Sequence, residues 1–330
     1  MTRPSSESEI RKITTEIQDL KREKDAIILV HNYQRPEVYE IADRIGDSLE
    51  LSVAARDSGK KTIVFCGVDF MAETAKILSP DARVLHPVPD ACCPMAHMIT
   101  PDEISRMKER YPSAEIVSYV NTTAEIKAMS DVCCTSANAP DIVRSCSSEE
   151  VIFLPDLNLA SYVQRFTPKK IIPGRGNCYV HDRITPLMVD NMRAFHPGSP
   201  FVAHPECRPD VIDRADAVCS TSGMIGYCRE SRASSFIIGT ENGMINRLKR
   251  EIPEKQYYPA GGVCTPMKQI TLQSVKTCLE KGSGEVNLAP DIMEASRVPL
   301  EKMIRISGKQ RNISCRENNA SLQDIRRGIV

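Results

Sequence analysis

The stretch IILVHNY, residues 27–33, sets the expectation for the fold of this 330-residue chain. Four apolar residues follow one another without alternation, and polar or aromatic side chains come directly after them, beginning with His31. A continuous apolar run of this kind is typical of a strand covered on both faces, as in a parallel sheet. The stretch therefore predicts a buried strand whose carboxyl end carries His31 and Tyr33.

Two later stretches have the same pattern. IVSYVN, residues 116–121, closes with Tyr119 and Asn121, and FVAHPE, residues 201–206, closes with His204 and Glu206. In all three stretches the two closing side chains are two positions apart. The same strand end is therefore expected three times in one chain.

Further landmarks recur in the same order and at nearly the same spacing. The dipeptide Ile-Thr occurs as Ile13-Thr14, Ile99-Thr100, Ile184-Thr185 and Ile270-Thr271. A hydroxyl side chain follows each strand end, at Ser48, Ser136 and Thr221. A proline and then a cysteine close each unit, at Pro87 and Cys93, Pro173 and Cys178, and Pro259 and Cys264. We infer a threefold repeat of about 85 residues.

The repeat predicts the fold class and the domains. Each unit alternates helices with buried strands and ends in a cysteine loop, an order typical of parallel α/β layers. Units of about 85 residues are small for independent stability, so we expect three similar three-layer α/β domains in a pseudo-threefold arrangement around a central active-site cavity. The expected domains are 1–98, 99–183 and 184–279, with 280–308 packing back on the first and 309–330 forming a loosely ordered tail.

Composition restricts the classes of function. The chain has 43 basic and 43 acidic residues and no net charge, which argues against a nucleic-acid or membrane-surface partner. Its longest apolar runs are far shorter than the roughly 20 residues that span a bilayer. The polar start of the chain predicts an amphipathic helix rather than a signal peptide. We therefore expect a cytoplasmic protein with no nucleic-acid or membrane partner.

The strand ends and the hydroxyl positions predict a binding pocket. Ligands of parallel α/β units sit at the carboxyl ends of the strands, where helix N-termini suit phosphate and carboxylate groups. Taken singly, the hydroxyls could be ordinary helix N-caps, His31 a structural histidine, and Tyr33 and Tyr119 packed aromatics. Core positions of a diverged repeat stay apolar, whereas these equivalent positions carry different reactive groups, which favours a shared pocket.

The cysteines of the repeat predict a metal centre. Most of the thirteen cysteines are expected to be buried thiols, because no CxxC pair or Cys/His zinc spacing occurs. Three thiolates around a threefold axis match one face of a [4Fe-4S] cube and leave the fourth iron open as a Lewis acid. A trigonal zinc site is the weaker alternative.

The alignment of the three repeat units indicates which cysteines face the centre. Either Cys92 or Cys93 could face the centre, but the sequence CPM that begins at Cys93 matches CTPM at Cys264. Cys133 and Cys134 have no counterpart at the repeat spacing, so they are expected in the core. Cys315 falls in the expected tail.

Together, these residues resemble the quinolinate synthase family over residues 27–308. The matching motifs are HNYQ with GDSLEL, SYVNTTAEIKA with TSANA, FLPD with GNCYVH, AHPEC with STSGM, and GTENG with CTPMKQITL. The resemblance implies three similar α/β domains around a cavity and a [4Fe-4S] cluster bound by Cys93, Cys178 and Cys264. It also implies a transferase of de novo NAD biosynthesis that condenses iminoaspartate with dihydroxyacetone phosphate, with functional coupling to L-aspartate oxidase or aspartate dehydrogenase.

The resemblance also implies roles for individual residues. Tyr33 and Glu206 would transfer protons, assisted by His31 and His204. The substrate would be held by ten residues, of which Val120 and Pro205 offer only backbone or shape: His31, Ser48, Tyr119, Val120, Asn121, Ser136, His204, Pro205, Glu206 and Thr221. Many relatives have a tryptophan shortly before the second cysteine, but this chain has none, so the packing near Cys178 is expected to differ.

Two other functions fit part of the pattern. A cluster-dependent hydro-lyase of the aconitase kind would also use three cysteines and an open iron, but it would need no triose phosphate. A non-catalytic iron-sulfur sensor would bind a dicarboxylate, although the chain has no basic patch for a nucleic acid.

Overall fold

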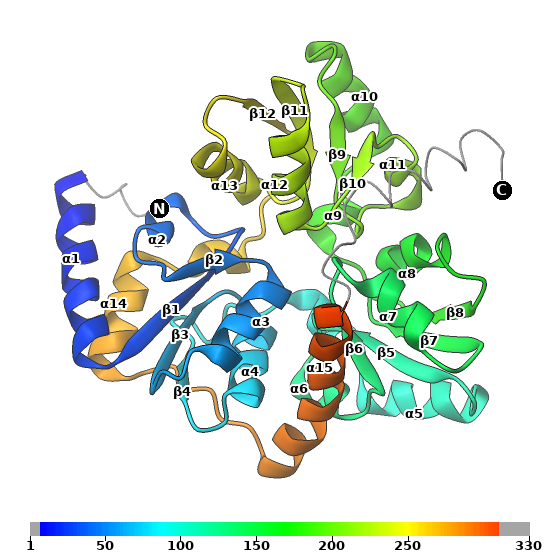
Figure 1. Cartoon of the computed structure of the whole chain (residues 1–330), viewed down its shortest axis with the longest axis horizontal. Coiled ribbons are helices and arrows are strands. Elements are labelled where there is room, and N and C mark those ends of the chain that lie inside the picture. The colour runs from blue at the N-terminus through cyan, green and yellow to red at the C-terminus, as the bar shows by residue number, and fades with distance from the viewer. Residues whose placement is uncertain (1–6, 310–330) are drawn as a thin grey trace.

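Three parallel sheets of four strands each form the frame of residues 7–309, the part of the chain that this computed structural model describes. Figure 1 shows the first sheet in blue, the second in green and the third in yellow-green, arranged around a common centre. Helices flank each sheet. The predicted α/β class, with three similar parallel units, is confirmed.

The three units have the same order of strands and helices. The first contains α1 (Glu7–Glu23), β1 (Ala26–His31), α2 (Pro36–Tyr39), β2 (Arg44–Gly46), α3 (Ser48–Asp57), β3 (Thr62–Cys66), α4 (Asp69–Leu78), β4 (Arg83–Leu85) and the 3-10 helix η1 (Pro94–His97). The second contains α5 (Pro101–Arg110), β5 (Glu115–Tyr119), α6 (Ala124–Ala128), β6 (Val132–Cys134), α7 (Ala139–Ser145), β7 (Glu150–Leu154), α8 (Leu157–Gln164), β8 (Lys170–Pro173) and α9 (Tyr179–Asp182). The third contains α10 (Pro186–Phe195), β9 (Phe201–Ala203), α11 (Pro209–Ile212), β10 (Ala217–Val218), α12 (Thr221–Glu230), β11 (Ser235–Gly239), α13 (Gly243–Glu251), β12 (Gln256–Pro259) and the 3-10 helix η2 (Pro266–Gln269). Two further helices follow, α14 (Leu272–Lys281) and α15 (Pro290–Lys309).

The strand orders determine where each unit can bind a ligand. They are β2-β1-β3-β4, β6-β5-β7-β8 and β10-β9-β11-β12, so the first strand of each unit lies between the second and the third. In open α/β sheets, ligands bind at the carboxyl ends of the strands beside such a reversal of order. The predicted strand in IILVHNY is β1, and its residues Ile28, Leu29 and Val30 are fully buried.

An aspartate fixes the start of the central strand in every unit. Its carboxylate accepts a hydrogen bond from a main-chain N–H of that strand, and its own N–H donates to the carbonyl of the same residue. The pairs are Ile28 N with Asp43 Oδ2 at 2.8 Å, Ile116 N with Asp131 Oδ2 at 2.7 Å, and Phe201 N with Asp216 Oδ2 at 2.8 Å. The repeat therefore extends to hydrogen bonds that the sequence landmarks did not include.

Three of the four Ile-Thr landmarks begin helices. The hydroxyls of Thr100, Thr185 and Thr271 cap α5, α10 and α14 by accepting a main-chain N–H of the first turn. The first landmark has no such role, because Thr14 lies inside α1, which already begins at Glu7. The polar residues before Thr14 continue the helix, whereas the other three threonines directly follow the cysteine loops.

The segment after the third unit connects the first two sheets. Helix α14 contacts α1 and β3, and the chain after it hydrogen-bonds to the first unit through Val286 N and Val84 O at 2.9 Å. Helix α15 contacts α4 but lies mainly against α6 and β6 of the second unit. The short α6 leaves part of the second sheet for α15 to cover, so 280–308 packs on more than the first unit.

The domain boundaries drawn from the repeat stay a prediction. Most of the predicted tail, with Cys315, lies outside the described residues.

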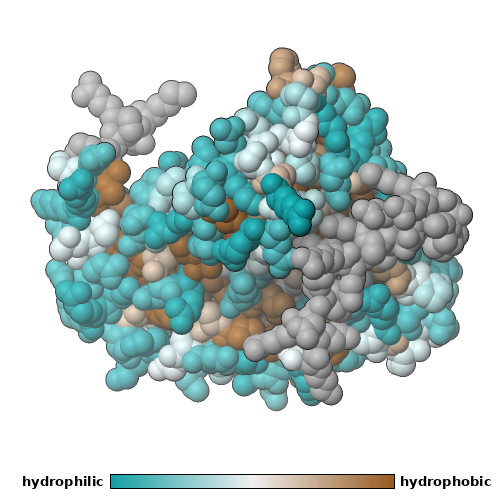
Figure 2. All heavy atoms as spheres, turned by 45° about the horizontal axis from the view of Figure 1, so that its top comes forward, coloured by the Kyte–Doolittle hydropathy of each residue, from teal (hydrophilic) through white to brown (hydrophobic). Residues whose placement is uncertain are grey.

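The face of the molecule in Figure 2 is largely hydrophilic, with hydrophobic residues at its top, over the third unit, and in patches at its left and lower centre. In that unit α10 exposes Leu187 and Phe195 to solvent. Among residues 7–309, no helix combines the length and the apolar character needed to cross a membrane.

Candidate active site

A small cavity lies where the three units meet, and it encloses about 70 Å³ of free space. Most of the predicted site residues line it: His31, Tyr33, Ser48, Cys93, Tyr119, Asn121, Ser136, Cys178, His204, Glu206, Thr221 and Cys264. Val120 and Pro205 are buried but are not part of its wall. The structure therefore brings residues from all three units into one pocket.

The spacing of the strand-end pairs has a local cause. His31 Nδ1 accepts a hydrogen bond from the main-chain N–H of Tyr33 at 3.2 Å, and His204 Nδ1 accepts one from Glu206 at 3.4 Å. The chain thus turns in the same way after β1 and β9 and directs both members of each pair into the cavity. Burial, together with the charge of Lys268, lowers the pKa of His31 to about 3, so this imidazole is neutral.

The predicted hydroxyls are not the caps of their helices. Asp47 caps α3 and Ser220 caps α12, and in each case the predicted residue, Ser48 or Thr221, comes next in the chain. Ser136 lies before α7, which begins at Ala139. The ordinary N-cap alternative therefore does not explain these three side chains. Two of them, Ser48 and Thr221, stand at the first position of a helix, next to the capping residue, and their side chains line the cavity.

A chain of hydrogen bonds leads from the cavity into the protein. The Tyr33 hydroxyl lies 2.7 Å from Thr240 Oγ1, which lies 2.7 Å from His181 Nε2. His181 Nδ1 in turn lies 3.1 Å from Glu206 Oε2. Tyr33, Thr240, His181 and Glu206 are all buried, and we call them the relay.

The partners within the relay determine where its protons lie. Because the Glu206 carboxylate can only accept, a neutral His181 carries its proton on Nδ1 and accepts at Nε2. The Thr240 hydroxyl then donates to His181, and the Tyr33 hydroxyl donates to Thr240. Burial and the nearby charge of Glu206 raise the pKa of Tyr33, so its resting state is the neutral phenol. In this arrangement the Glu206 carboxylate orients His181 as a base, and His181 acts on Tyr33 through the Thr240 hydroxyl.

Glu206 has further partners deep in the site. His204 Nδ1 lies 3.1 Å from Glu206 Oε2, and the rings of His181 and His204 stack with centroids 4.6 Å apart. Burial opposes the charge of Glu206, but these two histidines outweigh burial and lower its pKa. Burial and the charge of Glu206 raise the pKa of Asp156, so Asp156 is protonated more readily than Glu206.

The three cysteines of the repeat meet at the cavity, one from each unit. Cys93, Cys178 and Cys264 are half-buried, and each directly precedes or adjoins a short helix. Burial raises the pKa of all three thiols, so a positive metal group is needed to hold them as thiolates. Three converging thiols with no fourth cysteine in the wall fit a [4Fe-4S] cluster with one open iron.

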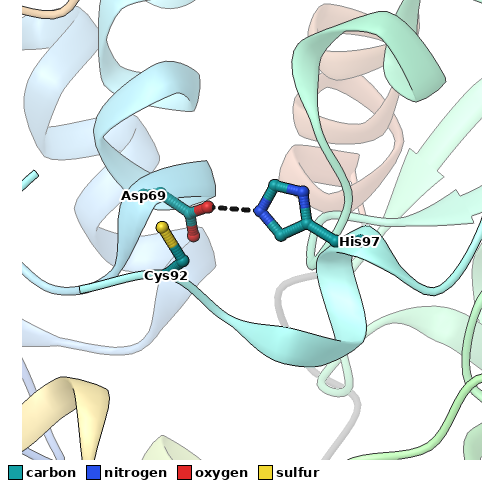
Figure 3. Close-up of side chains that lie close together, drawn as sticks. All are labelled: Asp69, Cys92 and His97. Atoms are coloured by element: carbon teal, nitrogen blue, oxygen red, sulfur yellow. Dashed lines mark hydrogen bonds and ion pairs between the residues drawn. The ribbon is translucent and has the colours of Figure 1, made fainter. Parts of the chain in front are cut away.

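The predictions for three other cysteines can be compared with the structure. Cys133 and Cys134 have no exposed surface, so their predicted place in the core is confirmed. Cys92 does not line the cavity, and its thiol lies near the side chains of Asp69 and His97, as Figure 3 shows. The potential ligand atoms of these three residues lie within 4.8 Å of one another.

Sequence reasoning missed several residues of the site. His181 lies three positions after Cys178, inside a motif that was used only to place the cysteine. Asp69, Asp156 and Glu241 each follow the third strand of a unit, at a repeat position that the landmarks did not use. The nearly equal spacing of these three acidic residues was the available signal. Thr240 lies inside the motif GTENG, but the motif does not indicate that Thr240 connects Tyr33 to His181, because that contact depends on the fold.

Comparison with known proteins agrees with this site. The family model described as quinolinate synthetase A protein matches residues 15–305. A quinolinate synthase of Methanoregula boonei is 52% identical over 88% of this chain and 97% of its own length. Quinolinate synthases of Geobacter sp. and Alkaliphilus metalliredigens are 46% and 48% identical, over 89% and 88% of this chain and 97% of each relative. The resemblance expected from the sequence is thereby confirmed, and the chain belongs to the quinolinate synthetase A family.

Proposed function

We propose that this chain is a transferase that condenses iminoaspartate with dihydroxyacetone phosphate and forms quinolinate, phosphate and water, in de novo NAD biosynthesis. One observation carries the proposal: three thiols from three units and a buried proton relay meet at a single cavity. The cytoplasmic location expected from the sequence is part of the proposal. So is the supply of the unstable imine by L-aspartate oxidase or aspartate dehydrogenase.

We assign the cofactor site to Cys93, Cys178 and Cys264. A bound [4Fe-4S] cluster would supply a Lewis-acidic iron that weakens the bond to a departing hydroxyl group of the substrate. The remaining chemistry belongs to the residues of the chain.

The polar wall suits substrates that carry carboxylate and phosphate groups. Ser48 and Thr221 begin α3 and α12, where main-chain N–H groups and the helix dipole favour anions. Thr221 Oγ1 also accepts a hydrogen bond from Asn32 Nδ2 at 2.9 Å, which fixes the position of its hydroxyl. We assign substrate binding to these residues with Tyr119, Asn121 and Ser136, and shape alone to Val120 and Pro205.

The relay suits the proton transfers of isomerisation and ring closure. When Tyr33 gives its phenolic proton to an intermediate, the phenolate takes the proton of the Thr240 hydroxyl, and Thr240 takes one in turn from Nε2–H of a doubly protonated His181, which keeps its Nδ1–H toward Glu206. In the reverse direction, a proton that reaches Tyr33 passes through Thr240 to His181 Nε2, where the Glu206 carboxylate stabilises the imidazolium. His31 is neutral and next to Tyr33, with ring centroids 4.7 Å apart, and assists as a hydrogen-bonding group.

The enclosed site also protects a reactive substrate. Tyr33, His204 and Glu206 are each less than one-tenth exposed, so the cavity excludes bulk water from its inner wall. Exclusion of water slows hydrolysis of an imine and strengthens the electrostatic interactions in the site.

Replacing Thr240 by valine is expected to lower kcat by roughly 10²-fold, because the isosteric side chain cannot connect Tyr33 to His181. Thr240→Ser restores the hydroxyl and should retain most of the activity. Steady-state kinetics on protein of equal iron content would measure both. Equal rates for the valine and serine variants would remove Thr240 from the relay.

The proposed function is tested by an anaerobic assay of cluster-reconstituted protein with iminoaspartate and dihydroxyacetone phosphate. We expect quinolinate to form, and to require both substrates. Lack of product from protein with a full cluster would contradict the proposal. Reversible hydration of a hydroxy acid without any triose phosphate would support a hydro-lyase instead.

A further inference from the structure

Two of the three cysteine loops are held by the same set of contacts. In the first unit, Asp69 Oδ1 accepts the main-chain N–H of Cys93 at 2.9 Å, and Asp69 Oδ2 lies 2.7 Å from His97 Nε2 (Figure 3). The histidine is four positions after the cysteine. A single carboxylate therefore binds both the start and the end of the loop.

The third unit repeats this arrangement with different side chains. Glu241 Oε1 accepts the main-chain N–H of Cys264 at 3.1 Å, and Glu241 Oε2 lies 3.1 Å from Lys268 Nζ. Lys268 again stands four positions after the cysteine. We call each set, Asp69 with His97 and Glu241 with Lys268, a carboxylate clamp.

The second unit lacks the clamp. Asp156 occupies the equivalent position after β7, but its Oδ1 accepts the main-chain N–H of Leu159 at 2.9 Å instead of that of a cysteine. The residue four positions after Cys178 is Asp182, an acid rather than a base. Within residues 7–309, no carboxylate accepts the main-chain N–H of Cys178.

The clamps have an electrostatic consequence for any cluster bound here. Main-chain N–H groups that donate to cluster sulfurs stabilise the reduced cluster and raise its reduction potential. A carboxylate that accepts such an N–H removes the donor, and its own negative charge further disfavours an added electron. The basic residue of each clamp compensates part of that charge.

We propose that Asp69 and Glu241 are positioning residues that withhold the N–H groups of Cys93 and Cys264 from the cluster and lower its reduction potential. The cluster then stays in its oxidised form and works as an acid rather than as an electron carrier. The inference rests on the cluster of the proposed function, but it concerns two carboxylates to which that proposal assigns no part in substrate binding.

The test compares reduction potentials of reconstituted variants by anaerobic spectroelectrochemistry. Asp69→Asn and Glu241→Gln keep an acceptor for the cysteine N–H and remove only the charge. Each should shift the oxidised-to-reduced ratio at a fixed potential by roughly tenfold toward the reduced cluster, which is about 59 mV for one electron. Lys268→Gln leaves Glu241 without its cation and should shift the ratio in the opposite direction.

A matched control is Asp131→Asn. Asp131 also binds a main-chain N–H with a carboxylate oxygen, but at the opposite edge of its sheet from the cysteines. Its replacement should leave the potential unchanged. If the clamps only stabilised the cysteine loops, the clamp substitutions would lower the fraction of protein that carries a cluster but would not change the reduction potential of the clusters that remain.

The outcomes separate this inference from the proposed function. Absence of a four-iron cluster in the unaltered protein would overturn both. A normal cluster whose potential is the same in the unaltered protein, Asp69→Asn, Glu241→Gln and Lys268→Gln would overturn the clamps alone. Shifts of the reduction potential in opposite directions for Glu241→Gln and Lys268→Gln would support the proposed role of the clamps. If one of these two variants binds no cluster, the direction of the shift in the other still tests the proposal.

Discussion

Replacing Cys93 by serine is expected to abolish the visible absorption of the cluster and to lower the iron content from about four atoms per chain toward zero. Among residues 7–309, Cys93 is the only cysteine of the first unit that lines the cavity, so without it the two remaining thiols would hold an incomplete face of the proposed cube. Turnover should fall by roughly 10³-fold or more, because the Lewis-acidic iron is lost with the cluster. Iron analysis and absorption spectra of anaerobically prepared protein would measure the loss.

The neighbouring cysteine provides the control. Cys92 lies outside the cavity wall and faces Asp69 and His97, so Cys92→Ser should keep the absorption and the iron content. Loss of the cluster in Cys92→Ser with retention in Cys93→Ser would show that the register of the cysteines is wrong by one position.

Replacing Glu206 by glutamine is expected to lower kcat by roughly 10³-fold while leaving the cluster in place. Glutamine keeps the shape of the side chain but loses the charge that orients His181 and stabilises its protonated form. The apparent KM should change far less than kcat, since the loss concerns proton transfer. Steady-state kinetics normalised to cluster content would separate the two parameters.

A carboxylate outside the cavity tests whether this effect is specific. Glu115 accepts main-chain N–H groups of Ser147 and Ser148 at the start of β5, far along the strand from Tyr119. Glu115→Gln should keep the turnover of the unaltered protein. A near-normal rate for Glu206→Gln would remove Glu206 from proton transfer.

Much of the fold could be predicted because local pattern and tertiary structure agree. IILVHNY is a continuous apolar run, and β1 is buried between two neighbouring strands, so the run and the burial have one cause. The nearly equal spacing of Cys93, Cys178 and Cys264 is likewise a property of the sequence, and the arrangement of the three sheets brings these residues to one cavity. Because the unit occurs three times, the spacing of equivalent residues along the chain predicts which distant residues meet in the fold.

Other features could not be read in this way. Ile13-Thr14 matched the spacing of the true helix starts, but a hydroxyl caps a helix only where the preceding chain is not already helical. The position of α15 depends on how much of the second sheet α6 leaves uncovered, which is set by packing and not by the sequence of α15. Thr240 acts only because two other units place a phenol and an imidazole on either side of it.

Within one molecule, the three equivalent strand ends carry three different side chains. Tyr33, Asn121 and Glu206 follow the first strands of three sheets with the same topology, and all three reach one cavity. The backbone at these positions is comparable, so the difference between a phenol, an amide and a carboxylate there reflects side-chain chemistry rather than scaffold. Exchanging residues between the three positions would measure what each group contributes without reference to any second protein.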